Sequence, residues 1–96
     1  MFYTCHLCGY PEQNKPPWTQ EGLSPSYEIC PCCGIEFGVD DINLLGFEIY
    51  KREWFEKGRD WFDQAKRPVN WEQEEQLKSI NKIKHEELPF YLLDAK

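Results

Sequence analysis

The sequence predicts a small α+β domain in which a short β-ribbon carries two cysteine turns and two helices follow. Three observations support this fold class: five cysteines lie within the first 33 residues, β-prone pieces precede them, and the later residues show helical periodicity. The chain of 96 residues has the length of one domain. We therefore expect residues 1–96 to form a single unit, with a cysteine-bearing half at 1–45 and a helical half at 46–96 that ends in an extended tail.

The cysteines form an internal repeat, Cys-x-x-Cys-Gly, at residues 5–9 and again at 30–34. Two residues between cysteines allow a tight turn to aim both sulfurs at one ion, and the following glycine accepts the positive φ that closes the turn. Twenty-one residues separate Cys8 from Cys30, which is close to the spacing of four-cysteine metal sites. The predicted ligands, which would surround one tetrahedral ion, are Cys5, Cys8, Cys30 and Cys33.

Two further side chains lie inside these turns. Cys32 does not match the repeat, so we expect it to point away from the ion as a small apolar filler, with a redox or ligand-exchange role as the alternative. His6 could replace a sulfur, but its expected role is packing or hydrogen bonding at the surface of the first turn.

The predicted ion is Zn²⁺, with iron as the alternative, because a tetrahedral set of four thiolates suits both. Catalytic zinc usually has three protein ligands and one open position, whereas four cysteines fill the shell. The sequence has no zinc-protease motif, nucleophile elbow or phosphate loop, and the other histidine, His85, lies among charged residues. We therefore expect a structural site in a protein that is not an enzyme.

The stretches 3–10 and 29–34 resemble the two metal-binding turns of rubredoxins, small iron proteins that transfer single electrons. A resemblance that covers more of the chain is carried by Cys-His-Leu-Cys-Gly-Tyr, Ser-Tyr-Glu-Ile-Cys-Pro-Cys-Cys-Gly and Phe-Gly-Val-Asp-Asp, at residues 5–10, 26–34 and 37–41. These motifs, with 47–54 and 70–71, are similar to those of the cysteine-rich CPCC family of small bacterial proteins. That resemblance implies a zinc-ribbon or rubredoxin-like metal-binding module and the four ligands already named.

Composition limits the partners. The formal net charge is −6, with 17 acidic and 11 basic residues, which argues against duplex nucleic acid as a partner. No secretory leader or membrane-spanning run is visible, so we expect a cytoplasmic protein without a membrane partner. The predicted role is a module that binds another protein, as a monomer or small homo-oligomer.

The predicted β-ribbon pairs residues 2–5 with 26–30, the pieces that lead into the two turns. A proline-rich loop without periodicity joins them. Trp18 in that loop is expected to cover the metal turns, and the alternative is an exposed anchor for a partner. The acidic pair Asp40 and Asp41 is expected in a solvated turn, with an acidic docking face as the alternative.

The first predicted helix covers 47–57, with Gly46 as N-cap and Gly58 beyond its end. Its aromatic residues recur at helical spacing, so we expect this face to cover the core rather than to form an exposed groove. A capping box at 70–73 predicts a second helix from Asn70 to about residue 85. Pro89 is expected to exclude further helix, and the apolar tail 88–93 to fold back on the domain, with an oligomer contact as the alternative.

Overall fold

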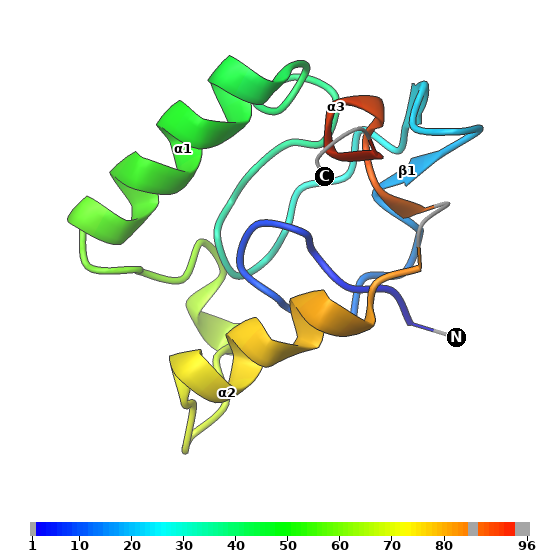
Figure 1. Ribbon diagram of the computed structural model, residues 1–96. Helices are drawn as coiled ribbons and strands as arrows, with labels where there is room; N and C mark the ends of the chain where they lie inside the picture. Colours follow the sequence, from blue (N-terminus) through cyan, green and yellow to red (C-terminus); the bar gives the residue numbers. More distant parts are fainter. Residues whose placement is uncertain (1, 85–86, 94–96) are drawn as a thin grey trace.

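The computed structural model describes residues 2–84 and 87–93, and within them two cysteine loops lie between the helices (Figure 1). The one sheet there is an antiparallel pair, in which Trp18 faces Pro25 and Thr19 faces Ser24. The elements, in chain order, are β1 (Trp18–Thr19), β2 (Ser24–Pro25), α1 (Leu44–Glu56), the 3₁₀ turn η1 (Gln64–Lys66), α2 (Gln73–Leu77), the 3₁₀ turn η2 (Lys78–Lys82) and α3 (Phe90–Leu93). This arrangement agrees with the α+β expectation but differs from it in the strands and in the helix ends.

The predicted pairing of residues 2–5 with 26–30 is wrong for the described chain. Tyr3 instead bridges Gln13, and Ile29 bridges Glu36, each across its own cysteine turn. A turn that reverses the chain within five residues brings its two flanks together at little cost in loop entropy. Each β-prone piece therefore pairs with the chain just beyond its own turn.

Helix α1 begins three residues before its predicted start because Asn43, not Gly46, is the N-cap. The Asn43 side-chain oxygen accepts a hydrogen bond of 2.8 Å from the backbone N–H of Gly46. The C-terminal prediction is confirmed, since Gly58 has φ +92° and donates its N–H to the carbonyl of Phe55. The N–H of Arg59 reaches the carbonyl of Trp54 at 2.9 Å, which completes a Schellman motif.

The apolar face of α1 packs on the core, as predicted. Phe47 and Trp54 are buried, while Tyr50 and Phe55 are partly buried against the same cluster. That cluster takes residues from both halves of the chain, and its buried members are Cys5, Leu7, Cys8, Tyr10, Cys30, Cys32, Cys33, Ile35, Phe37, Phe47, Trp54 and Trp61. The cysteine turns are thus a large part of the core itself.

The capping box predicted at Asn70 does not form. Helix α2 begins at Gln73, no side chain caps it, and the chain tightens into η2 after Leu77. Trp71, at a predicted first-turn position, instead stacks edge-on against Trp61, with ring centroids 5.3 Å apart. Burial of an indole outweighs a cap of about 1 kcal/mol, so tertiary packing overrides the local signal. The predicted end near His85 lies outside the described residues.

The C-terminal tail folds back on the domain, which confirms that prediction. The N–H of Phe90 donates to the carbonyl of Gly22 at 3.0 Å, and the hydroxyl of Tyr91 donates to the carbonyl of Asp41 at 2.7 Å. The expectation that Pro89 excludes helix is wrong, since α3 starts directly after it. Proline is accepted at the start of a helix, where no backbone donor is needed.

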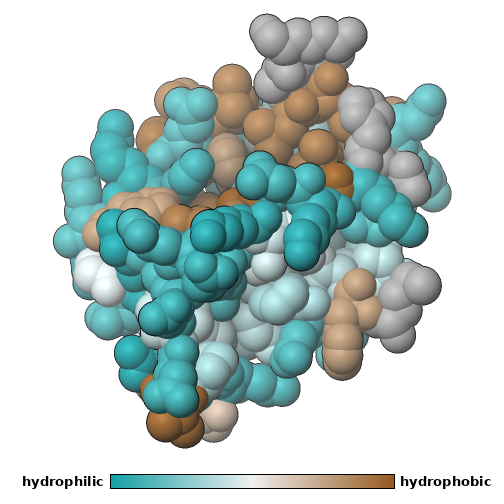
Figure 2. All heavy atoms as spheres, turned by 60° about the horizontal axis from the view of Figure 1, so that its bottom comes forward, coloured by the Kyte–Doolittle hydropathy of each residue, from teal (hydrophilic) through white to brown (hydrophobic). Residues whose placement is uncertain are grey.

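The face that bears α2 is mostly hydrophilic, and its apolar side chains gather in a few places near the edges (Figure 2). No helix of the described residues is both long and apolar enough to cross a membrane. Among the described residues, the hydrophobic side chains that stay most exposed are those of Val69, Leu45, Leu23, Phe62, Phe2 and Tyr27.

Candidate metal centre

The sequence repeat becomes a structural repeat. In the first turn the N–H of Gly9 donates to the carbonyl of Cys5, and the N–H of Cys5 donates to the carbonyl of Tyr10, both at 2.9 Å. The second turn has the same two bonds, from Gly34 to Cys30 at 2.9 Å and from Cys30 to Ile35 at 3.0 Å. The two glycines adopt φ values of +84° and +79°, where residues with a Cβ are strained.

The two turns bring together the four sulfurs that the repeat predicted as ligands. All four lie within 4.8 Å of one another. The Sγ atoms of Cys5 and Cys33 are 3.8 Å apart, and those of Cys8 and Cys30 are 3.6 Å apart. Sulfurs at about 2.3 Å from one tetrahedral ion are separated by about 3.8 Å. The cluster therefore has the dimensions of a metal site, and each close pair joins one turn to the other.

The cluster is closed to water over almost its whole surface. Cys5, Cys8 and Cys30 are fully buried, and Cys33 is 4% exposed. Among the described residues this is the one group of histidine, cysteine or acidic side chains close enough to hold an ion. Four buried thiolates could bind a divalent cation tightly without leaving an open position for substrate.

The thiols influence one another's ionisation. Burial raises the pKa of Cys8 and of Cys33 well above the ordinary value, and neighbouring thiols add to the rise. Burial also acts on Cys30, but hydrogen bonds from Cys33, Cys5 and Cys8 outweigh it and bring the pKa of Cys30 well below the ordinary value. A bound divalent ion would supply the charge that lets all four ionise.

Cys32 is buried and lies outside the sulfur cluster, as predicted, but it is more than an apolar filler. Its Sγ accepts a hydrogen bond of 3.3 Å from the side-chain amide of Gln76, which also donates to the carbonyl of Cys8 at 3.0 Å. The Gln76 carbonyl oxygen accepts from the indole N–H of Trp71 at 2.8 Å. One glutamine of α2 therefore ties both cysteine turns to the second half of the chain.

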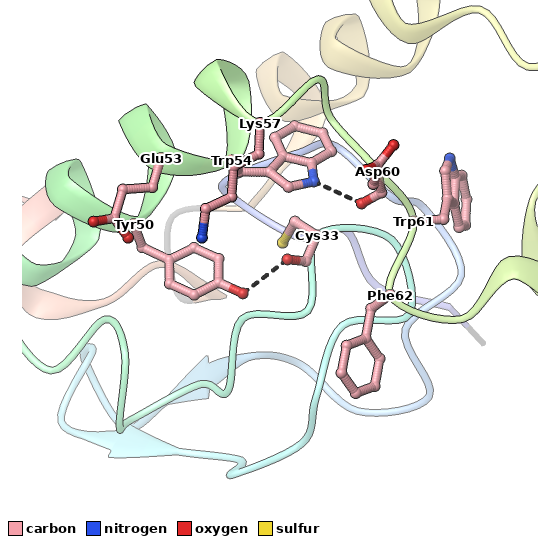
Figure 3. A pocket seen from close by; sticks show the side chains of 8 residues that line it. All are labelled: Cys33, Tyr50, Glu53, Trp54, Lys57, Asp60, Trp61 and Phe62. Atoms are coloured by element: carbon pink, nitrogen blue, oxygen red, sulfur yellow. Dashed lines mark hydrogen bonds between the residues drawn. The ribbon is translucent and has the colours of Figure 1, made fainter.

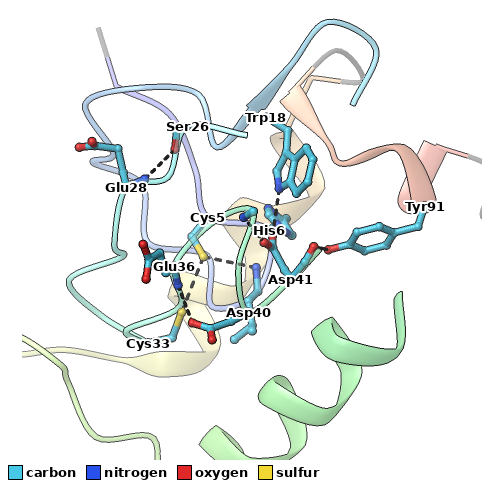
Figure 4. Close-up of polar contacts among 12 residues, drawn as sticks. Cys5, His6, Trp18, Ser26, Glu28, Cys33, Glu36, Asp40, Asp41 and Tyr91 are labelled. Carbon is cyan, nitrogen blue, oxygen red and sulfur yellow. Dashed lines mark hydrogen bonds and ion pairs between the residues drawn. The ribbon is translucent and has the colours of Figure 1, made fainter. Parts of the chain in front are cut away.

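His6 and Asp41 form a buried polar pair beside the cluster (Figure 4). His6 packs and forms a hydrogen bond, as predicted, but in the interior rather than at the surface of the first turn. His6 is 3% exposed and lies in the interior, where its Nε2 is 2.8 Å from Oδ2 of Asp41. The imidazole packs between Phe37 and Phe47, with centroids 5.6 and 5.4 Å away. Asp41 is fully buried, so the solvated turn predicted for it is wrong.

Asp41 organises the loop that follows the second cysteine turn. Besides His6, it accepts the indole N–H of Trp18 at 3.0 Å and the backbone N–H of Gly38 at 2.6 Å. Burial by itself would raise the pKa of Asp41, but the hydrogen bonds from His6, Gly38 and Trp18 outweigh it and lower that pKa. The hydroxyl of Tyr91 donates to its backbone carbonyl. Asp41 thus joins three parts of the chain: its carboxylate holds the first cysteine turn and β1, and its backbone carbonyl holds the C-terminal tail.

Trp18 is buried, so it is not an exposed anchor, and its position differs from the predicted cover over the metal turns. Its ring packs edge-on against Phe90 and Tyr91, at centroid distances of 6.5 and 6.4 Å. The sequence gives no local signal for Asp41 or Gln76, because their partners lie 35 and 68 residues away in the chain. The hint that the sequence offers is indirect: Trp18 and His6 each carry a ring nitrogen that needs a polar partner if the side chain is buried.

Comparisons with known proteins give relatives without a stated function. No family model matches the chain, and no solved structure matches it. The uncharacterized protein YoaQ of Bacillus subtilis is 31% identical over 70 aligned positions, and the match covers 58% of this chain and 59% of that protein. The uncharacterized protein YozI of the same organism is 31% identical over 71 aligned positions, and that match also covers 58% of this chain and 59% of the relative. The chain thus spans about three fifths of the length of these relatives.

Proposed function

We propose that this chain is a small zinc-binding protein in which a structural Cys₄ site organises a module that binds another protein. The observation that carries the proposal is the cluster of four buried sulfurs, whose closest separations of 3.6 and 3.8 Å match the edges of a tetrahedron around zinc. The ligands are Cys5, Cys8, Cys30 and Cys33, and the resemblance to cysteine-rich CPCC proteins points the same way.

A structural role is favoured over a catalytic one because the four thiolates complete the shell and sit in the core. Structural zinc contributes about 10–16 kcal/mol of apparent binding free energy. That is comparable to or larger than the net stability of about 5–15 kcal/mol for a typical domain. In this protein the sulfurs are core residues, so losing the ion would leave mutually repelling or unpaired groups where the two halves meet. Under this proposal the protein is therefore not an enzyme, and it needs its metal to fold.

Metal content and paired substitutions test the proposal. Purified protein should contain about one zinc per chain, and Cys8→Ser should lose the ion and most of its folded structure. Cys32→Ser is the matched control, because Cys32 is equally buried but lies outside the cluster. We expect Cys32→Ser to keep the zinc and to lose at most about 1–2 kcal/mol of unfolding free energy. If Cys8→Ser melts like the natural protein, the structural-zinc proposal is wrong.

A rubredoxin-like iron protein that transfers electrons is the second candidate. The observation that favours it is the position of Cys33, a buried cysteine of the cluster that also lines a pocket open to solvent. Electrons could enter a thiolate-bound iron along this edge. Elemental analysis and a visible spectrum decide between the two, because iron–thiolate sites are coloured and bleach on reduction, whereas zinc sites are colourless. A colourless, zinc-loaded protein from iron-rich medium would exclude this candidate.

A further inference from the structure

A pocket of about 270 Å³ lies beside the second cysteine turn, between that turn, the C-terminal part of α1 and the segment that follows it (Figure 3). Small-molecule and cofactor sites usually hold about 300–1,000 Å³. This pocket is therefore suited to one long side chain rather than to a nucleotide. Its lining residues are Cys33, Tyr50, Glu53, Trp54, Lys57, Asp60, Trp61 and Phe62.

The aromatic walls of the pocket are held in place before any ligand arrives. The indole N–H of Trp54 donates to the backbone carbonyl of Asp60 at 3.0 Å, and the Tyr50 hydroxyl donates to the carbonyl of Cys33 at 2.9 Å (Figure 3). Trp54 is buried, whereas Phe62 is 64% exposed. A pocket with fixed walls and one accessible ring loses little conformational entropy when it is filled.

The charges around the pocket favour a cation. Glu53 and Asp60 are exposed, and neither forms an ion pair within residues 2–84 and 87–93, while Lys57 supplies one opposing charge. Four thiolates around a divalent ion would add about two negative charges behind Cys33.

We propose that this pocket receives the side chain of an arginine from a protein partner. A planar guanidinium stacks on aromatic faces, is weakly hydrated and pairs with carboxylates, so it fits aromatic walls next to two free acids better than an ammonium does. The proposal deepens the interaction role given above and rests on that role. It does not depend on whether the bound metal is zinc or iron.

The test uses the metal-loaded full-length protein with N-acetylarginine amide as the probe and N-acetylcitrulline amide as its neutral control. The two probes have nearly the same shape but differ by one charge. Nuclear magnetic resonance spectra of the tryptophan indole N–H groups follow binding directly. We expect the arginine probe to shift the signals of Trp54 and Trp61 with a dissociation constant in the range of about 1 mM. The citrulline probe should bind at least about five-fold more weakly.

Variants at the pocket then separate this site from general charge attraction. Asp60→Asn and Phe62→Ala should each weaken arginine binding about two- to five-fold, and Lys57→Gln should strengthen it. Glu74→Gln on α2 removes the same charge as Asp60→Asn but lies away from this pocket, so it should leave the affinity unchanged. Phe62 is mostly exposed, so its removal leaves the core intact.

Three results would overturn the proposal: equal binding of the two probes, no shifts up to about 10 mM probe, or an Asp60→Asn effect that Glu74→Gln reproduces. Zinc content and the melting temperature are measured on every sample. A folded, zinc-loaded protein that ignores arginine refutes the pocket while leaving the metal proposal standing. A protein that folds and binds arginine without metal refutes the structural-zinc proposal alone.

Discussion

Asp41→Asn should destabilise the protein strongly, although it changes one atom. The buried carboxylate accepts from His6 and Trp18 on Oδ2 and from the N–H of Gly38 on Oδ1. Asparagine has one acceptor oxygen, so its amide nitrogen must face a donor. An unsatisfied buried N–H costs about 1–3 kcal/mol, and replacing charged with neutral bonds costs about 1 kcal/mol more. We expect the free energy of unfolding to fall by about 2–4 kcal/mol, which corresponds to a decrease of roughly 8–30 °C in melting temperature.

Urea unfolding at saturating zinc, followed by tryptophan fluorescence, measures this loss. Asp40→Asn is the matched control, because the neighbouring Asp40 carboxylate accepts a single bond from the N–H of Glu36 at 2.9 Å. An asparagine oxygen can still accept that bond, so the control should lose no more than about 0.5 kcal/mol. Equal losses at the two positions would refute the reasoning, since they would show that the buried network adds nothing beyond an ordinary turn.

The lowered pKa of Asp41 also predicts how the stability difference between the natural protein and Asp41→Asn depends on pH. A carboxyl whose pKa is lower in the folded state stabilises the fold above its unfolded pKa of about 4 and loses this contribution as the pH falls through the folded pKa. The difference between the natural protein and Asp41→Asn should therefore stay constant from about pH 8 to about pH 5. A difference that halves within this window would show that the carboxylate is not stabilised by its donors.

Two further predictions concern the contact between α2 and the cysteine turns. Gly9→Ala would place a Cβ against the carbonyl of Gln76 at a backbone φ of +84°, so we expect it to lower the free energy of unfolding in urea by about 2–4 kcal/mol. Gly58→Ala is the control, because Gly58 has a similar φ of +92° but open space around it, and it should lower that free energy by about 1 kcal/mol. Equal losses would contradict close packing at Gly9. Gln76→Ala should lose about 1–3 kcal/mol and increase hydrogen exchange in α2, because the carbonyl of Cys8 and the indole of Trp71 lose their partner. Unchanged exchange would contradict this role for Gln76.

The sequence alone was sufficient to predict the two cysteine turns and their four sulfur ligands. Two residues between cysteines and a glycine after them form a local pattern, and a five-residue turn is determined by its own φ angles and hydrogen bonds. The end of α1 shortly before Gly58 was predictable for the same reason. The predicted start of α1 is wrong because the amphipathic stripe begins only at Phe47, whereas the cap at Asn43 lies four residues earlier.

Predictions failed where a local preference competes with a distant partner. The capping box at Asn70 is a sound local signal, yet Trp71 gains more by packing on Trp61. Asp41 reads as a surface residue because aspartate is seldom buried without partners. Its donors come from a histidine 35 residues away and a tryptophan 23 residues away.

What the sequence itself determined is the chemistry of the centre: four thiols, their pairing into two turns, and the glycines that let each turn close. Only the tertiary structure decided what surrounds the centre, namely the carboxylate of Asp41, the amide of Gln76 and the pocket beside Cys33. The physical reason is the range of the forces involved. Turn geometry is set by neighbouring dihedral angles, whereas a buried polar group is satisfied by whichever donor the packing of large aromatic side chains brings within about 3 Å.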